Sequence, residues 1–169
     1  MAELAGSKTE KNLKEAFAGE SQANRKYLAF AKKADLDGFP QVAKLFRAAA
    51  AAETVHAHAH LRALKGIGAT ADNLREAIGG ETHEFMDMYP RMIVEAEQEG
   101  FTEALRSFKF ANVVEKVHAG LYQKALESLG KNAQVDYYVC QVCGHTLEGE
   151  PTGPCEVCGA GKNAFQKID

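Results

Sequence analysis

Two copies of a Glu-x-x-His element carry the residues of this chain that are best suited to bind metal. They read Glu53-Thr54-Val55-His56 and Glu115-Lys116-Val117-His118 and lie 62 residues apart. Because residues three apart share one face of a helix, each element points a carboxylate and an imidazole in the same direction. Carboxylates with one imidazole per metal suit iron or manganese, and bridging carboxylates hold two ions close together. The doubling therefore favours a two-metal site.

The repeat extends well beyond these ligand-type residues. The offset between the copies is 61 at Glu20 and Glu81 but 62 from Tyr27 and Tyr89 onward, so the second copy gained one residue between those points. Two copies are too few for a solenoid, and the pattern predicts a duplicated helical hairpin. Other matched positions are residues 16–21 with 77–82, Asp37-Gly38-Phe39 with Glu99-Gly100-Phe101, and Phe46 with Phe108.

The elements that must position these residues are helices. Apolar residues at helical spacing predict four of them, at about 8–36, 39–65, 73–98 and 101–129. We expect Thr70 or Asp72 to cap the third helix and Pro90 to bend it. The four helices form two hairpins, 8–65 and 73–130, and the predicted fold is mainly α, with a four-helix bundle that buries the apolar stripes.

Glu20 and Glu81 lie on the apolar stripes of the first and third predicted helices. Together with the two Glu-x-x-His elements they give the ligand set of di-iron and di-manganese carboxylate bundles. A single Glu-x-x-His usually lies on a solvated helix face, but two copies in register with two more inward Glu residues favour metal, because unpaired Glu is rarely buried. Glu84, which corresponds to Ala23, follows Glu81 by three residues and gives one metal an additional carboxylate, unless it is a surface residue.

Four further residues lie close to this set. Tyr27 and Tyr89 fall about two turns beyond Glu20 and Glu81, where a phenol can hydrogen-bond a bridging carboxylate, although simple core tyrosines explain them too. His58 and His60 follow His56, and we assign neither of them a function.

The four cysteines form a second constellation, within a predicted small domain at 134–169. They lie in two C-x-x-C-Gly knuckles, Cys140 to Gly144 and Cys155 to Gly159. A segment of this size rarely buries enough core to fold without metal or disulfides, and in a reducing compartment the spacing indicates metal. The glycine after each knuckle lets backbone N–H groups point at sulfur. Zinc ribbons share this spacing, so the cysteines alone leave iron and zinc open.

Composition excludes several classes of protein. The chain has 169 residues and a formal net charge of −3, with Lys and Arg scattered among acidic residues. It therefore offers no basic stripe for nucleic acid and no polybasic patch for a membrane surface. The sequence shows neither a signal peptide nor an apolar run of about 20 residues, so we expect a cytoplasmic protein.

With both constellations in view, the whole chain resembles the rubrerythrins, which join a ferritin-like di-iron bundle (here 1–131) to a rubredoxin-like Fe(Cys)4 domain (here 134–169). The resemblance rests on Phe17 to Ala23, Gly80 to Phe85, Met88-Tyr89-Pro90 and Tyr138 to His145. It implies two non-haem irons and one Fe(Cys)4 per chain. The implied ligands are Glu20, Glu53, Glu81, Glu84, Glu115 and His118 for the di-iron centre, with His56 replacing Glu84 on one iron upon reduction, and Cys140, Cys143, Cys155 and Cys158 for the single iron.

The resemblance also implies a function, that of an NADH-linked peroxidase. Hydrogen peroxide would be reduced to water at the di-iron centre, and electrons would return through the cysteine-bound iron from an external donor, either rubredoxin or an NAD(P)H-dependent reductase. Two alternatives remain. One is a ferritin-like ferroxidase that handles iron, and the other is an electron carrier or zinc-stapled binding module with a metal-free bundle.

The connector between the hairpins departs from the family pattern, because it has only about seven residues where rubrerythrins commonly have more. A ferritin-like bundle must carry this connection along its whole length, roughly 40 Å for a 27-residue helix. Seven extended residues reach at most about 25 Å. We therefore predict a helix-swapped homodimer, in which residues 1–65 of one chain complete each bundle with residues 73–130 of the other.

Overall fold

The computed structural model describes residues 3–169. The chain forms two compact units, one that ends at Gly68 and one that runs over Ala69–Asp169. The boundary lies within the predicted connector. The division into a bundle at 1–131 and a cysteine domain at 134–169 stays a prediction.

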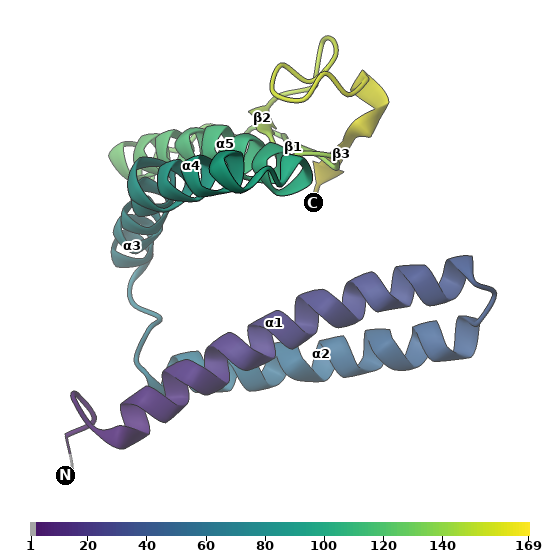
Figure 1. Ribbon diagram of the computed structural model, residues 1–169. Coiled ribbons are helices and arrows are strands. Elements are labelled where there is room, and N and C mark those ends of the chain that lie inside the picture. The colour runs from purple at the N-terminus through teal and green to yellow at the C-terminus, as the bar shows by residue number, and fades with distance from the viewer. Residues whose placement is uncertain (1–2) are drawn as a thin grey trace. The chain divides into compact units, whose positions relative to one another are not determined.

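The first unit is a hairpin of two long helices, α1 (Lys8–Leu36) and α2 (Pro40–Ala63), which run side by side in Figure 1. Ser7 caps α1 by accepting a hydrogen bond from the Glu10 N–H. The helix stops before Gly38, whose φ of 80° is in the left-handed region that glycine tolerates, and Pro40 begins α2. Both predicted helices of this unit are confirmed.

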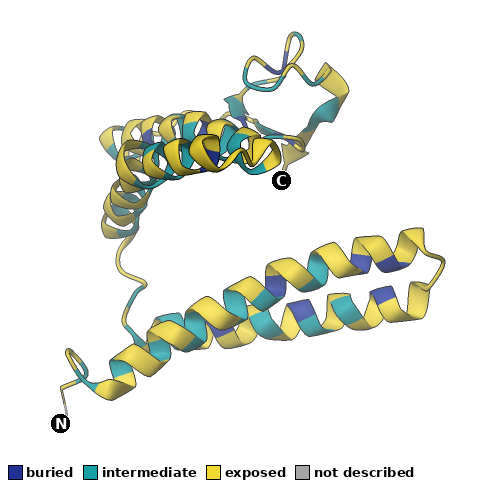
Figure 2. Cartoon of the chain, viewed as in Figure 1, coloured by how far each residue is buried: buried dark blue, intermediate teal, exposed yellow. Residues whose placement is uncertain are grey.

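Small residues let α1 and α2 approach closely. Ala43, Ala50 and Ala57 of α2 are buried at intervals of seven residues, and Ala31 and Ala34 of α1 pack with Ala43 in one cluster. Figure 2 shows these buried positions as short patches on helices whose remaining surface is exposed or half-buried. This line of contact between α1 and α2, the alanine seam, is therefore narrow, and much of the surface of each helix is left for another surface to cover.

The second unit begins with a helix that changes character midway. It consists of α3 (Thr70–His83), a π-helical segment η1 (Glu84–Met88) and α4 (Tyr89–Glu99). The predicted third helix is confirmed, but it starts at Thr70, and Ala69 precedes it without a side-chain cap. The expected cap was wrong because Thr70 and Asp72 lie inside the first turn, where Asp72 pairs with Arg75 at 2.7 Å.

A bend was expected at Pro90, and the structure has the π-helical segment η1 there, which ends two residues before the proline. Proline has no N–H to donate to the preceding turn, and its ring crowds the carbonyl four residues back. A π-turn is also the form that a helix takes when it accommodates one additional residue. This places the residue gained by the second copy at η1, between Glu81 and Tyr89.

Helix α5 (Thr102–Glu127) packs against α3 and α4, and a small sheet follows. The sheet has the antiparallel strand order β2-β1-β3, from β1 (Tyr137–Cys140), β2 (Thr146–Glu148) and β3 (Phe165–Ile168), with a short 3₁₀ turn, η2 (Lys162–Ala164), before β3. Strand β2 contacts α5. Among the described helices, none combines the length and the apolar character needed to cross a lipid bilayer.

Candidate metal centres

The first Glu-x-x-His element forms a carboxylate–histidine cluster in the first unit. Glu20 of α1 and Glu53 and His56 of α2 place one ligand atom each within 4.8 Å of the others. His56 Nδ1 lies 2.9 Å from a Glu53 oxygen, and the His56 side chain is 56% exposed. The two helices thus bring together three of the predicted ligands, with the imidazole at the open side.

The second unit builds the same cluster from the second copy. Glu81 of α3 and Glu115 and His118 of α5 again lie within 4.8 Å of one another. His118 Nδ1 is 2.7 Å from Glu115 Oε2 and 3.7 Å from Glu81 Oε1. Both copies of the duplicated hairpin therefore assemble the same donors, two carboxylates and one imidazole nitrogen.

The electrostatics of the second cluster favour a cation. Burial raises the pKa of Glu81 above its usual value of 4.5, and the neighbouring Glu115 carboxylate raises it further, while His118 lowers it. Two half-buried carboxylates that face each other are costly to ionise without a positive charge between them. Ligands of an ion with bonds of about 2.1 Å lie up to about 4.2 Å apart, so the observed cluster fits a metal after a small closure.

Glu84 lies on the π-helical segment and is outside this tight cluster. Its charge nevertheless reaches the same region. Burial raises the pKa of Tyr89, and the carboxylates of Glu84, Glu115 and Glu81 raise it further. The Glu84 carboxylate therefore lies near the cluster without belonging to it, and its role as a metal ligand stays a prediction.

The predicted tyrosines form matching aromatic contacts. The rings of Tyr27 and Phe46 have centroids 6.1 Å apart, and those of Tyr89 and Phe108 are 6.2 Å apart. Hydrogen bonds from these phenols to the carboxylates stay a prediction. His58 and His60 join neither ligand cluster of the described chain, and His58 lines a cavity of about 290 Å³ beside Glu53.

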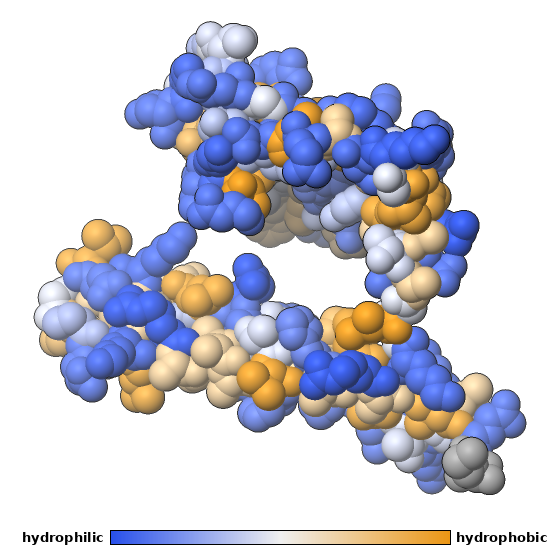
Figure 3. Space-filling model, turned by 180° about the vertical axis from the view of Figure 1, so that it is seen from behind, coloured by the Kyte–Doolittle hydropathy of each residue, from blue (hydrophilic) through white to orange (hydrophobic). Residues whose placement is uncertain are grey.

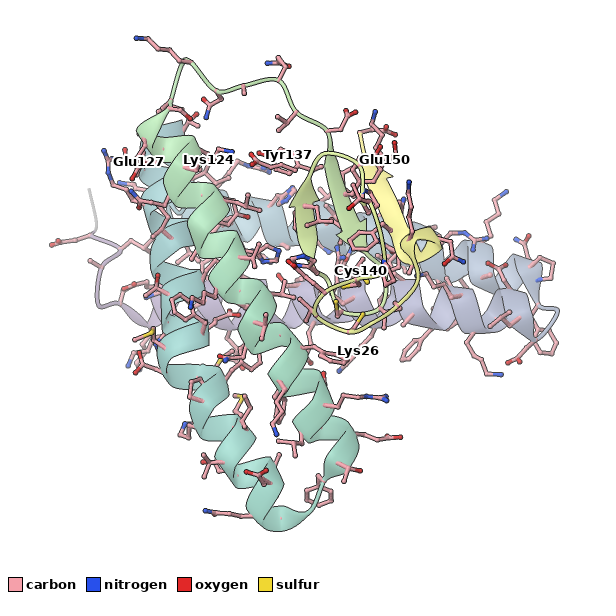
Figure 4. The ribbon with its side chains drawn as sticks, turned by 90° about the horizontal axis from the view of Figure 1, so that it is seen from above. Lys26, Lys124, Glu127, Tyr137, Cys140 and Glu150 are labelled. Carbon is pink, nitrogen blue, oxygen red and sulfur yellow. The ribbon has the colours of Figure 1, made fainter. Side chains whose placement is uncertain are left out.

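The four cysteines converge in the second unit, where Figure 4 labels Cys140 beside the two knuckle loops. The Sγ atoms of Cys140 and Cys158 are 3.7 Å apart and those of Cys143 and Cys155 are 3.6 Å apart. Disulfide sulfurs lie at about 2.05 Å, whereas four sulfurs bound to one tetrahedral metal at about 2.3 Å lie about 3.8 Å from one another. The spacing fits a tetrahedral metal.

Backbone geometry prepares the cysteines for this metal. Gly144 and Gly159 adopt φ values of 84° and 75°, and their N–H groups donate to the carbonyls of Cys140 and Cys155. Burial raises the pKa of Cys140, but hydrogen bonds from the Val142 and Cys143 N–H groups lower it more, to about 7. The Cys140 thiolate is therefore accessible near neutral pH, whereas burial raises the pKa of Cys143 and Cys158.

Two polar residues that sequence reasoning missed support the clusters. Asn24 is buried on α1 and donates to Ala50 O and Thr54 Oγ1, one residue from Glu53. Its position four residues after Glu20 on an apolar stripe was a signal that could have revealed it. Thr146 of β2 contacts His118, and no local pattern indicates a contact between residues so far apart in the sequence.

Comparisons with known proteins place the chain among iron proteins. The sequence profile of the rubrerythrin family matches residues 11–126. Rubrerythrin-2 of Clostridium acetobutylicum is 36% identical, over 91% of this chain and 93% of the relative. Rubrerythrin of Porphyromonas gingivalis is 34% identical, over 98% and 92%, and nigerythrin of Nitratidesulfovibrio vulgaris is 34% identical, over 93% and 85%.

Solved structures give the same result. The structure of mixed-valent nigerythrin aligns with a TM-score of 0.58 at 34% identity, over 97% of this chain and 90% of that one. Fully reduced, all-ferrous nigerythrin aligns with a TM-score of 0.59 at 33% identity, over 97% and 91%. These similarities confirm the predicted fold class, a ferritin-like helical protein with a rubredoxin-like domain.

Proposed function

The chain belongs to the rubrerythrin family, and from this premise we propose that it is a peroxidase that reduces hydrogen peroxide to water. The observation that carries the proposal is the pair of matching clusters, Glu20, Glu53 and His56 on one hairpin and Glu81, Glu115 and His118 on the other. Two ferrous ions bound there would supply together the two electrons that turn hydrogen peroxide and two protons into two waters.

We propose for these side chains the ligand roles that the family resemblance implies. Glu20, Glu53, Glu81 and Glu115 would hold the two ions with His118, and Glu84 would add a carboxylate to one of them. His56, the more exposed of the two histidines, would replace Glu84 on one iron upon reduction. The cysteine knuckles would hold a single iron that passes electrons from an external donor.

We also propose that the working form is a helix-swapped homodimer. Each unit holds half of the ligand set, and the segment between α2 and α3 has only six residues, 64–69. Val42 and Tyr122 lie 11 residues before Glu53 and seven after Glu115, hence on the carboxylate faces of their helices, and they are 46% and 37% exposed. Figure 3 shows further apolar side chains at the helix surfaces. The complementary hairpin of a second copy would cover them.

We further propose that a rubredoxin or an NAD(P)H-dependent reductase delivers electrons to the cysteine-bound iron. All four cysteines are free thiols in the structure, in keeping with a reducing compartment such as the cytoplasm.

Anaerobic stopped-flow spectroscopy on the reduced, iron-loaded protein tests the activity. The protein is mixed with hydrogen peroxide or with oxygenated buffer, and the visible bands of both iron centres are followed. We expect faster oxidation by peroxide, with the Fe(Cys)4 band developing as the di-iron site turns over. Faster oxidation by oxygen would favour a ferroxidase instead, and the absence of the Fe(Cys)4 band would favour a zinc-stapled module.

A further inference from the structure

The imidazole of His118 is held at both nitrogens. Nδ1 faces the carboxylates, 2.7 Å from Glu115 Oε2, while Nε2 lies 3.0 Å from the hydroxyl oxygen of Thr146. The hydroxyl of Thr146 donates its single hydrogen to the Gly144 carbonyl oxygen at 3.1 Å. With that hydrogen directed at Gly144, the hydroxyl accepts at its contact with His118, and this assigns a hydrogen to Nε2.

This arrangement decides which nitrogen is free for a metal. The 2.7 Å contact of Nδ1 with Glu115 needs a hydrogen between the two atoms, and a metal bound there would take the place of that hydrogen. Because Nε2 keeps its hydrogen, Nδ1, which faces Glu115 and Glu81, is the nitrogen that can give a lone pair to the ion. Hydrogen bonds from the outer nitrogen of a ligating histidine fix the tautomer and the ring orientation, and their loss typically lowers metal affinity. Thr146 thus selects the metal-binding form of His118.

The contact lies in partly apolar surroundings. His118 and Thr146 are both half-buried and line a cavity of about 360 Å³ whose other walls include Leu74 and Leu121. The Lys124 side chain of α5 also pairs with Glu148 of β2, so a second contact holds the strand that carries Thr146 against the helix that carries His118.

The first hairpin has the same Glu-x-x-His element without this support. His56 Nδ1 contacts Glu53, but its Nε2 has no hydrogen-bond partner within residues 3–169. The side chain of His56 is 56% exposed, against 27% for His118. Two copies of the Glu-x-x-His element thus produce, within the described residues, one imidazole that is hydrogen-bonded at both nitrogens and one that is hydrogen-bonded at Nδ1.

We infer that Thr146 is a positioning residue that fixes the tautomer of His118 and thereby makes one of the two matched half-sites rigid. Its hydroxyl also connects that half-site to the carbonyl of Gly144, the residue after Cys143, so hydrogen bonds link the cysteine loop to the carboxylate cluster within one chain. The inference rests on the metal-binding role of the clusters in the proposed function. It goes beyond that function by assigning the cause of the difference between the two histidines.

Nitrogen NMR of the histidine rings in the full-length protein loaded with diamagnetic zinc tests the assignment without any activity. In the wild type we expect His118 to bind through Nδ1 and to show a slowly exchanging Nε2–H. In Thr146→Val this hydrogen should exchange rapidly, while Thr146→Ser, which keeps the hydroxyl, should restore the slow exchange. His56 provides an internal control whose signals should be the same in all three proteins.

A cobalt titration gives the second measurement. With zinc in the cysteine site, cobalt(II) absorption reports binding at the carboxylate sites, and we expect Thr146→Val to weaken it about 10- to 100-fold and Thr146→Ser to restore it. Coordination through Nε2, or a Thr146→Val protein with unchanged hydrogen exchange and cobalt affinity, would overturn the inference. Neither outcome depends on peroxide turnover, so failure of the peroxidase proposal is recognised separately, by stopped flow.

Discussion

Tyr89 and Phe108 lie with their ring centroids 6.2 Å apart, and this contact repeats the one at 6.1 Å between Tyr27 and Phe46 in the other hairpin. The repeat is informative because Tyr89 is the eighth residue after Glu81, whereas Tyr27 is the seventh after Glu20. The π-helical segment Glu84–Met88 absorbs the additional residue. The rest of the hairpin thus keeps its register, and Glu84 is added beside the cluster.

Removal of the additional residue should convert this segment to a regular helix. We expect deletion of Asp87, whose side chain is 73% exposed, to preserve helix content by circular dichroism and to keep the contact of Tyr89. Glu84 should lose its place beside Glu81, and the affinity for one of the two irons should fall at least about tenfold. Asp87→Ala is the control without a register change. Full iron loading in the deletion variant would contradict a ligand role for Glu84.

The raised pKa of Glu81 gives the metal-free protein a specific pH dependence. A carboxyl whose folded-state pKa exceeds its unfolded value of 4.5 favours the folded state only while it is protonated, so stability falls as pH rises from below 4.5 through the folded-state pKa. Glu81→Gln removes this loss. In chelator, thermal unfolding should show the variant to be more stable than the wild type at pH 7, with the difference shrinking toward pH 4.

A Glu15→Gln variant, on an exposed part of α1, should show no such pH-dependent gain. Metal should reverse the order at pH 7, because the wild type gains stability from the ion and Glu81→Gln gains less. A variant that is equally stabilised by metal would argue against Glu81 as a ligand.

The cysteine site should hold its own domain together. We expect Cys143→Ser to lower metal affinity there by more than about 100-fold, since even changes outside the ligand shell cost about 10- to 100-fold. The strands β1–β3 should then lose amide protection in hydrogen exchange, because so small a segment has little core of its own. Val142→Ala, a change of an exposed residue within the same knuckle, should leave both measurements unchanged. Retained protection in Cys143→Ser would show that the sheet folds without metal.

The narrow alanine seam predicts a stability difference between neighbouring positions. Ala50 is 1% exposed, whereas Ala51 is on the exposed side of α2. Ala50→Leu overfills the seam and should lower the free energy of unfolding by about 1–3 kcal/mol. Ala51→Leu should change it by no more than about 0.5 kcal/mol. Urea unfolding followed by circular dichroism measures both, and equal effects would show that the seam is loosely packed.

Local spacing predicted most of the fold and of the candidate ligands, because helical periodicity and the C-x-x-C pattern are set by residues close in sequence. The cap of α3 was misassigned because Thr70 and Asp72 are both good capping residues, and neither type reveals which turn comes first. The contact of Thr146 with His118 depends on how β2 packs on α5, which no short pattern encodes. The additional residue of the second copy was visible in the sequence as a change in the offset between the copies. Only the structure shows that the helix accommodates this residue as a π-helical segment.

The short connector makes the oligomeric state testable. Helix α2 has 24 residues and is about 36 Å long, while the six residues 64–69 reach only about 22 Å when fully extended. We expect the wild type to have twice the 18.3 kDa mass of one chain in light scattering. Insertion of about 20 Gly and Ser residues after Gly68 would provide enough reach for closure within one chain.

The lengthened protein should therefore become a monomer that still binds iron at the carboxylate site. The same insertion after Gly149, in a loop of the cysteine domain, lengthens the chain without relaxing the connector and should leave the dimer intact. A wild-type monomer with a complete di-iron centre would reject the swap. A lengthened variant that remains a dimer would show that contacts other than the short connector hold the two chains together.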